Sequence, residues 1–199
     1  MYREIRPALS LVLLFTLILG VALPTAFTGL AQALFPFQAN GSLIRHDGQL
    51  IGSALIGQNF TGPDWFTPRP SALTGTDASG KTIATPYNAA ESGGSASGPT
   101  NAGMIANVKT RIAAYHAAYG PGPVPDDAVT TSGSGLDPDI SLENAARQAP
   151  SIAAARKLPP ATVTALISRL AHHRILGIIG TDHVNVLKLN LALSRLAAP

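Results

Sequence analysis

The stretch from Pro7 to Ile44 constrains this chain most, because its 38 residues include no Asp, Glu, Lys or Arg. Its apolar part, Ala8 to Leu34, is 27 residues long, and as a helix at ~1.5 Å per residue it spans about 40 Å. That length exceeds the ~30 Å hydrocarbon layer of a bilayer. We therefore predict a short start at residues 1–6 and one transmembrane helix at 7–35. Because proline removes a helical hydrogen bond, we expect either a kink at Pro24 or a break where the segment leaves the membrane.

Small residues recur at spacing four within this helix, pairing Ala22 with Ala26 and Gly29 with Ala33. Such pairs let a second helix approach closely inside a membrane, so we predict that these positions pack against a partner helix. The alternative is that alanine and glycine are simply frequent in this segment.

The start of the chain also resembles a secretory signal, with a basic beginning and small residues from Ala22 to Ala26. Signal sequences have apolar cores of only about 7–15 residues, whereas this one continues further, which favours an uncleaved anchor. Arg3 and Arg6 precede the helix and should stay on the cytoplasmic side. Residues 36–199 are then predicted to form a domain on the outer side of the membrane.

The composition of the chain limits what this domain can do. Residues 36–199 are enough for one domain with a modest core. The chain has no cysteine, which for an exported domain indicates a bacterial envelope and excludes thiol catalysis and cysteine-ligated metal. The net charge of +3 is spread thinly rather than gathered into a basic stripe, so we expect no nucleic-acid partner.

Local patterns predict an α+β domain. Two apolar runs around Asp47-Gly48 indicate a hairpin, and the Pro- and Gly-rich residues 58–100 indicate a long irregular loop. Amphipathic stretches predict three or four helices, and alternating leucines predict a C-terminal strand that completes a small sheet with the hairpin. We expect helices from Asn101 to Tyr119, from Ser141 past Gln148 to Lys157 and from Val163 to Gly177, the first two capped by Asn101 and Ser141. We expect the strand from Val184 to Leu193 to be half-buried, with its leucines on one side and Lys188 and Asn190 on the other.

No motif in the chain predicts catalysis or metal binding. Gly75 to Thr82 matches the phosphate-loop pattern GxxxxGK[ST], but its proline-rich lead-in cannot be a central strand, so we interpret it as a flexible tip. His172 and His173 are adjacent and diverge on a helix, which predicts solvent-facing side chains. A Ser/His/Asp triad is recognised by geometry rather than spacing, so an anchored envelope hydrolase with a hidden serine is the alternative function. Four carboxylates are expected to cap helices and form turns rather than bind a hard cation: Asp126, Asp127, Asp137 and Asp139.

Several strings occur together along the chain: Gly52-Ser-Ala-Leu-Ile-Gly-Gln-Asn-Phe60, Arg69-Pro-Ser-Ala72, Tyr87-Asn88, Ser92-Gly-Gly-Ser95, Gly98-Pro-Thr-Asn101, Thr131-Ser-Gly-Ser-Gly-Leu-Asp-Pro138 and Val184-Asn-Val-Leu-Lys-Leu-Asn-Leu-Ala-Leu193. In this order they resemble the KdpC family, the C subunit of the bacterial potassium-transporting Kdp ATPase. The resemblance covers essentially the whole chain, anchor included. The chain departs from the family pattern by a longer stretch from Leu73 to Pro86, which contains the phosphate-loop match.

The resemblance implies an accessory subunit rather than an enzyme, anchored in the bacterial inner membrane by one span. Its implied partners are a potassium-channel-like subunit, a P-type ATPase subunit and a very small stabilising subunit. The family is also described as a catalytic chaperone that raises the ATP affinity of the ATPase subunit. We therefore expect no firmly bound cofactor, with ATP contact possible through the ATPase subunit. The glutamine linked to this role matches Gln148, although Ser151-Ile152 stands where Arg-Val is usual.

The predicted orientation conflicts with direct contact between Gln148 and ATP, because the body lies outside and ATP is inside. Either an effect of this chain on ATP affinity is then allosteric, or the nucleotide-linked role that the resemblance implies for Gln148 is wrong. The alternative, which we favour, is that the body braces or caps the potassium entrance of the channel-like partner.

Overall fold

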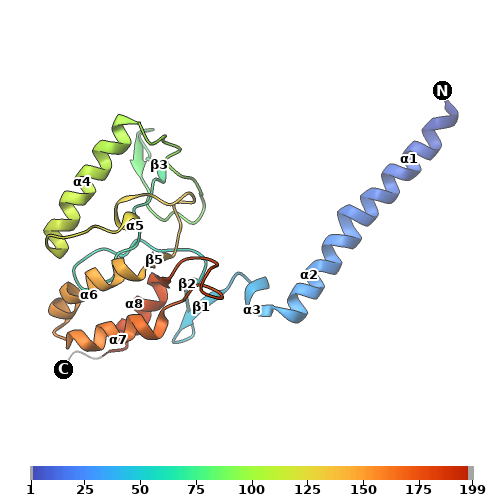
Figure 1. The fold of residues 1–199 in the computed structure, drawn as a ribbon. Helices are drawn as coiled ribbons and strands as arrows, with labels where there is room; N and C mark the ends of the chain where they lie inside the picture. The colour runs from blue at the N-terminus through green and yellow to red at the C-terminus, as the bar shows by residue number, and fades with distance from the viewer. Residues whose placement is uncertain (1, 197–199) are drawn as a thin grey trace. The chain divides into compact units, whose positions relative to one another are not determined.

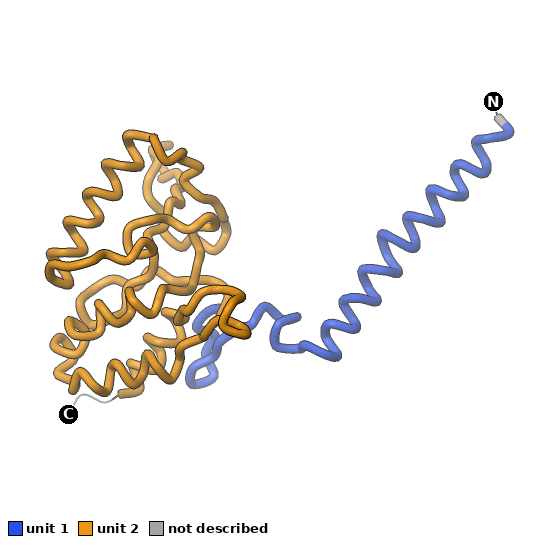
Figure 2. Tube along the Cα trace, viewed as in Figure 1, with its two compact units in different colours: residues 1–53 blue, residues 54–199 orange. Residues whose placement is uncertain are grey.

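The computed structural model describes residues 2–196 and confirms a mixed fold of helices and small strand pairs, with one long apolar helix at the N-terminus. The chain divides into two compact units, residues 1–53 and residues 54–199, which Figure 2 distinguishes by colour. Unit 1 contains the apolar helix and a hairpin. Unit 2 contains the hydrophobic core that positions the candidate site.

Unit 1 begins with a long helix whose segment from Arg3 to Leu34 is long and apolar enough to cross a membrane. The helix starts before Pro7, the first residue of the predicted span. A π-helical turn lies within it directly before α2, whose second residue is Pro24. The helix continues past Pro24 to Leu34 and is not broken there, and a kink at Pro24 stays a prediction. The helix comprises α1 (Tyr2–Leu17), the π-helical turn (Ile18–Ala22) and α2 (Leu23–Leu34).

The predicted hairpin at Asp47-Gly48 is confirmed. After the short helix α3 (Pro36–Ala39), strand β1 (Leu43–His46) pairs antiparallel with β2 (Gln49–Ser53). Asp47 and Gly48 have φ of 49° and 79°, the left-handed values that a two-residue hairpin turn of this kind needs. Asp-Gly is one of the dipeptides that adopt these values at low cost, which is why this local signal is reliable.

Unit 2 is built on helices that pack around the short strand pair β5 (Asp139–Ser141) and β6 (His183–Asn185) (Figure 1). The helices are α6 (Leu142–Arg156), α7 (Pro160–Leu170) and α8 (Val186–Ser194). Ser141 caps α6, as predicted, because its side-chain oxygen accepts a hydrogen bond from the N–H of Asn144 at 3.0 Å. They share one core, whose fully buried members include Phe66, Ile140, Ile152, Val163, Leu189 and Leu193.

A further helix, α4 (Ala102–Tyr119), begins at its predicted cap and contacts α6. The side-chain oxygen of Asn101 accepts a hydrogen bond from the N–H of Met104 at 2.9 Å. The apolar face predicted for this helix is only partly covered, since Tyr115 is buried while Ile105 is 41% exposed. The short helix α5 (Asp126–Val129) follows.

The predicted strand from Val184 to Leu193 is wrong. Only β6 at its beginning is extended, and the rest is α8, which Asn185 caps by accepting a hydrogen bond from the N–H of Lys188 at 3.0 Å. Leucines at every second position fit a strand, but the buried positions Val186, Leu187, Leu189, Asn190 and Leu193 follow the period of a helix. The sequence signals that favour a helix here are the cap residue Asn185 and the helical spacing of the buried residues.

The helix predicted to end at Gly177 ends earlier, at Leu170. Residues 171–183 instead form a narrow loop in which His172 pairs with His183 and Ile175 with Ile179. The reason is burial: Leu166 and Ile167 fill the core, whereas Ile175 is 66% exposed and has no core to cover. The prediction that His172 and His173 face solvent is confirmed.

Residues 58–100 are mostly irregular, as predicted, but they include a small hairpin of β3 (Thr74–Thr76) and β4 (Thr82–Ala84). The predicted sheet that joins the first hairpin to a C-terminal strand is not formed. Among the described residues the strands make three separate pairs, β1 with β2, β3 with β4 and β5 with β6. Of these pairs, β5 with β6 contributes to the core, through the buried side chains of Ile140 and Val184.

The phosphate-loop match from Gly75 to Thr82 is the β3–β4 hairpin, not a strand followed by a helix. The N–H groups of Ser79 and Lys81, which a phosphate would need, donate to Oδ1 of Asp77 at 2.8 and 3.0 Å. The Ser79 hydroxyl also donates to this oxygen, and together these bonds lower the pKa of Asp77. The turn is thus saturated by its own carboxylate.

Candidate functional site

Gln148, the residue that the family resemblance links to nucleotide, lies on α6 with only 1% of its surface exposed. Its Oε1 accepts hydrogen bonds from the N–H and the hydroxyl of Thr67 at 2.8 and 3.1 Å. Its Nε2 donates to the carbonyl of Thr67 at 3.2 Å and to Oδ1 of Asn144 at 2.9 Å. An amide side chain offers two donors and an acceptor with two lone pairs, so Gln148 has used its full capacity within its own domain.

Asn190 on α8 holds the preceding loop residue in the same way. Its Oδ1 accepts from the N–H of Phe66 and its Nδ2 donates to the carbonyl of Phe66, both at 2.9 Å. We call Gln148, Asn190 and the two residues that they hold, Phe66 and Thr67, the amide clasp. Each side chain pairs with both backbone groups of one residue, as a neighbouring strand would. The clasp therefore fixes the loop 58–100 onto two helices of the core.

The alternation of leucines predicted Asn190 on the solvent side of a strand, and this is wrong, because the residue is 1% exposed.

Arg156 reinforces the clasp at the end of α6. Its Nε donates to the carbonyl of Asp64 at 2.6 Å, and its guanidinium lies over the ring of Trp65, 4.3 Å from the centroid. Residues 64–67 are thus held by side chains from both helices.

Asn144 extends the clasp toward α4 and α5. This buried residue accepts a hydrogen bond from the hydroxyl of Tyr115 at 3.0 Å and donates to Oδ2 of Asp127 at 3.0 Å. Asp127 also accepts from the N–H and hydroxyl of Ser141, each at 2.9 Å. Burial raises the pKa of Tyr115 to about 12, so its hydroxyl remains a donor at neutral pH. Asn144 was not predicted as a functional residue, and its one local signal is its place in the first turn of α6.

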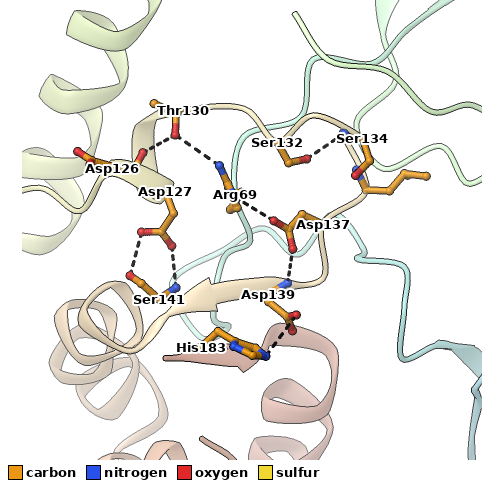
Figure 3. Close-up of polar contacts among 12 residues, drawn as sticks. Arg69, Asp126, Asp127, Thr130, Ser132, Ser134, Asp137, Asp139, Ser141 and His183 are labelled. Carbon is orange, nitrogen blue, oxygen red and sulfur yellow. Dashed lines mark hydrogen bonds and ion pairs between the residues drawn. The ribbon is translucent and has the colours of Figure 1, made fainter. Parts of the chain in front are cut away.

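A polar cleft of about 830 Å³ opens beside this network, where the β5–β6 pair meets α5 (Figure 3). We call it the acidic cleft. Arg69 enters it from the loop 58–100, and its Nη1 donates to Oδ2 of Asp137 at 2.9 Å. Six carboxylates line the cleft against the two guanidinium groups of Arg69 and Arg174: Asp126, Asp127, Asp137, Asp139, Glu143 and Asp182.

Two of the carboxylates predicted to form caps and turns do so. Asp127 binds the first turn of α6, and Oδ1 of Asp137 accepts a hydrogen bond from the N–H of Asp139 at 3.0 Å. Asp139 itself is partly buried, and this burial raises its pKa although His183 lies opposite with Nε2 3.9 Å from Oδ2. The cleft therefore combines carboxylates that hold the backbone with others that face solvent.

Ser141 and His183 are cross-strand partners in the β5–β6 pair, next to Asp139, and bring the residue types of a serine triad together. The Ser141 hydroxyl donates to Asp127, and its oxygen accepts from the N–H of Asn144. A nucleophilic serine needs its hydroxyl bonded to a base such as histidine, and Ser141 is committed to capping instead. Within residues 2–196, no group of three or more His, Asp or Glu side chains is arranged to hold a metal ion.

The small residues predicted to pack against a partner helix are all exposed along α2 and the turn before it. A side chain added at Gly29 would meet no atom within 4 Å, so this face of the helix is open. The positions concerned are Ala22, Ala26, Gly29 and Ala33, and their packing against another helix stays a prediction.

Comparison with known proteins gives consistent matches. A family model described as "KdpC: K+-transporting ATPase, c chain" matches residues 5–195. A relative from Caulobacter vibrioides is 51% identical over 200 residues, covering 100% of this chain and 96% of its own length. Relatives from Methylorubrum extorquens and Allorhizobium ampelinum are 52% and 46% identical, each over 99% of its own length. All three are named "Potassium-transporting ATPase KdpC subunit".

Proposed function

Since this chain belongs to the KdpC family, the c chain of K+-transporting ATPases, we propose that it is a non-catalytic accessory subunit of an ATP-driven potassium uptake pump. The observation that carries the proposal is the family match over residues 5–195, which includes both the apolar helix and the domain. The saturation of Ser141 and of the Asp77 turn supports a role other than catalysis.

We further propose that the chain is a single-pass protein of the bacterial inner membrane with its N-terminus inside and unit 2 outside. The support is the apolar helix from Arg3 to Leu34 and the placement of Arg3 and Arg6 at its start. The proposed partners are a potassium-channel-like subunit, a P-type ATPase subunit and a very small stabilising subunit. The open face at Gly29 provides a surface against which a partner's helix can pack closely.

The proposed mechanism is mechanical rather than chemical. The clasp and the Asn144 network tie the loop 58–100, α4, α5 and α6 into one body, which can brace the outer side of the channel-like subunit. If the chain raises the ATP affinity of the pump, as the chaperone description of the family holds, we propose that it does so allosterically. Gln148 then acts by fixing the shape of unit 2, because its amide has no atom left for a nucleotide.

This function is tested by purifying the pump with and without the chain. We expect the remaining subunits to assemble poorly without it and their potassium-stimulated ATP hydrolysis to fall on the order of tenfold or more, within the range of coupling between sites in one complex. Adding the purified chain back in lipid nanodiscs should restore both. Unchanged assembly and unchanged potassium-stimulated hydrolysis in its absence would refute the proposal.

A further inference from the structure

The loop 171–183 of unit 2 ends in an exposed apolar turn. The N–H and carbonyl of Ile175 pair with those of Ile179 at 2.9 and 3.0 Å, and Leu176 and Gly177 turn the chain with φ of 55° and 75°. Four aliphatic side chains project from this turn, and we call them the apolar tip: Ile175, Leu176, Ile178 and Ile179, exposed by 66, 84, 80 and 58%. Contiguous exposed apolar groups on a folded domain mark interaction sites.

The stem below the apolar tip is firmly built. His172 and His183 exchange two backbone hydrogen bonds of 2.8 and 3.0 Å, and their rings stack with centroids 5.4 Å apart. Oδ1 of Asp182 accepts a hydrogen bond from the N–H of Arg174 at 3.0 Å. The stem continues directly into β6, which is paired with β5. The fold therefore presents the tip away from its own core instead of folding it inward.

The stem also forms one wall of the acidic cleft. Arg174, Asp182 and His183 line it together with α5 and the start of α6. Asp126 on α5 and Glu143 on α6 line the cleft with the stem, and neither side chain has an ion-pair partner among the described residues. An apolar projection thus lies beside a surface with a surplus of negative charge, six carboxylates against two guanidinium groups.

From this juxtaposition we propose that the apolar tip and the acidic cleft form one docking surface for the extramembrane part of another pump subunit, one that offers an apolar socket flanked by lysine or arginine side chains. The inference rests on the proposed function, since it takes the chain to be part of a multi-subunit pump. Apolar anchors at the centre and complementary charges beside them are the usual organisation of a protein interface.

Charge selects this occupant over two others. An anionic lipid surface attracts basic segments, and insertion of the tip into a bilayer would bring the carboxylates of the acidic cleft toward negative headgroups. A second copy of this chain would place like charges opposite one another in a two-fold contact. A cationic protein surface instead neutralises Asp126 and Glu143 while its socket covers Leu176.

The absence of cysteine from the chain makes the tip directly accessible to experiment. Leu176→Cys places one thiol on the tip, and Ala78→Cys places one on the exposed β3–β4 turn as the matched control. Each full-length variant is labelled with a polar maleimide, first alone in lipid nanodiscs and then in the assembled pump. We expect Cys at 176 to react rapidly in the chain alone and at least tenfold more slowly in the pump, while Cys at 78 reacts equally in both.

If the pump assembles and Cys at 176 still reacts rapidly, the docking surface is refuted and the proposed function stands. Protection of Cys at 176 in nanodiscs without the other subunits would show burial in lipid and overturn the choice of occupant. If the wild-type chain does not assemble at all, it is the proposed function that fails.

The charged half of the surface is tested separately with Asp126→Asn and Glu143→Gln in one chain. The double variant should bind the remaining subunits at least tenfold more weakly at low salt, and the difference should shrink as ionic strength rises. Asp77→Asn, on the β3–β4 turn and not among the residues that line the acidic cleft, is the control for loss of a carboxylate elsewhere on unit 2. Equal binding by the double variant and the wild-type chain at low salt would overturn the proposed charge complementarity.

Discussion

Replacing Gln148 and Asn190 together by alanine is expected to lower the free energy of unfolding of unit 2 by about 4 kcal/mol. The two amides are the hydrogen-bond partners of the N–H and carbonyl groups of Phe66 and Thr67, and Phe66 is fully buried. A buried polar group that loses its partner costs about 1–3 kcal/mol, partly relieved here by water entering the space of the lost side chains. The melting temperature should fall by about 10 °C.

The fluorescence of Trp65 measures this effect, because it is the chain's one tryptophan and adjoins the clasp. Asn107→Ala removes an exposed amide on α4 and should change the melting temperature by less than about 2 °C. The two single variants also separate a structural role for Gln148 from nucleotide contact. If the clasp acts through shape, Gln148→Ala and Asn190→Ala reduce the ATP affinity of the assembled pump to similar extents. A loss confined to Gln148→Ala, with an unchanged melting temperature, would contradict the clasp.

Gly135→Ala is expected to destabilise unit 2 by about 3 kcal/mol, for steric reasons. Gly135 has φ of +69°, and a methyl group there would lie 2.6 Å from Cγ of Leu73 and 2.9 Å from the carbonyl oxygen of Gly93. Its own carbonyl accepts from the Ser71 hydroxyl and its N–H donates to Ser132, so the backbone cannot move freely to relieve the contact. The substitution should therefore loosen the loop 58–100 where it meets residues 132–137.

Gly133→Ala is the matched control for this substitution. It lies two positions away in the same turn, has an ordinary φ and would meet no atom within 4 Å of an added Cβ. We expect its effect on the free energy of unfolding to be within about 0.5 kcal/mol, measured by chemical denaturation. If both substitutions lowered the free energy of unfolding by similar amounts, the close approach of Leu73 and Gly93 to Gly135 would not be the cause of the loss.

The features that could be predicted from sequence depend on neighbouring residues. Asn101 and Ser141 were recognised as caps because a cap needs only its own oxygen and an N–H three residues later. Asp47-Gly48 was recognised because two residues fix the turn. The apolar helix from Arg3 to Leu34 follows from composition alone. In each case the physical cause lies within a few residues of its effect.

The clasp could not be predicted, because its partners are far apart in sequence. Thr67 and Gln148 are separated by 81 residues, and Phe66 and Asn190 by 124. The residues next to Gln148 and Asn190 in the sequence do not distinguish these buried amides from solvent-exposed ones, and the leucines around Asn190 fit a strand as well as a helix. The acidic cleft has the same origin: the β5–β6 pairing brings Asp139 beside His183, although neither position carries a local signal.

The apolar tip was misassigned for a related reason. The prediction extended the helix to Gly177 by counting Ile175 with Leu166 and Leu170, although at nine and five residues from them Ile175 lies off their helical face. A run of apolar residues predicts that their side chains are buried, but not whether the same chain or another one buries them. In the proposed docking surface, another subunit buries the apolar tip.

The side of the membrane that carries unit 2 decides whether it can brace the outer face of the channel-like subunit, and cysteine labelling in whole cells measures this directly. Ala78→Cys reports on unit 2 and Ile5→Cys on the start of the chain, each as the one thiol of a full-length protein. An impermeant maleimide added to intact spheroplasts should label Cys at 78 and should label Cys at 5 only after lysis. Labelling of Cys at 5 in intact spheroplasts, with Cys at 78 protected until lysis, would place unit 2 on the side of ATP and contradict the account.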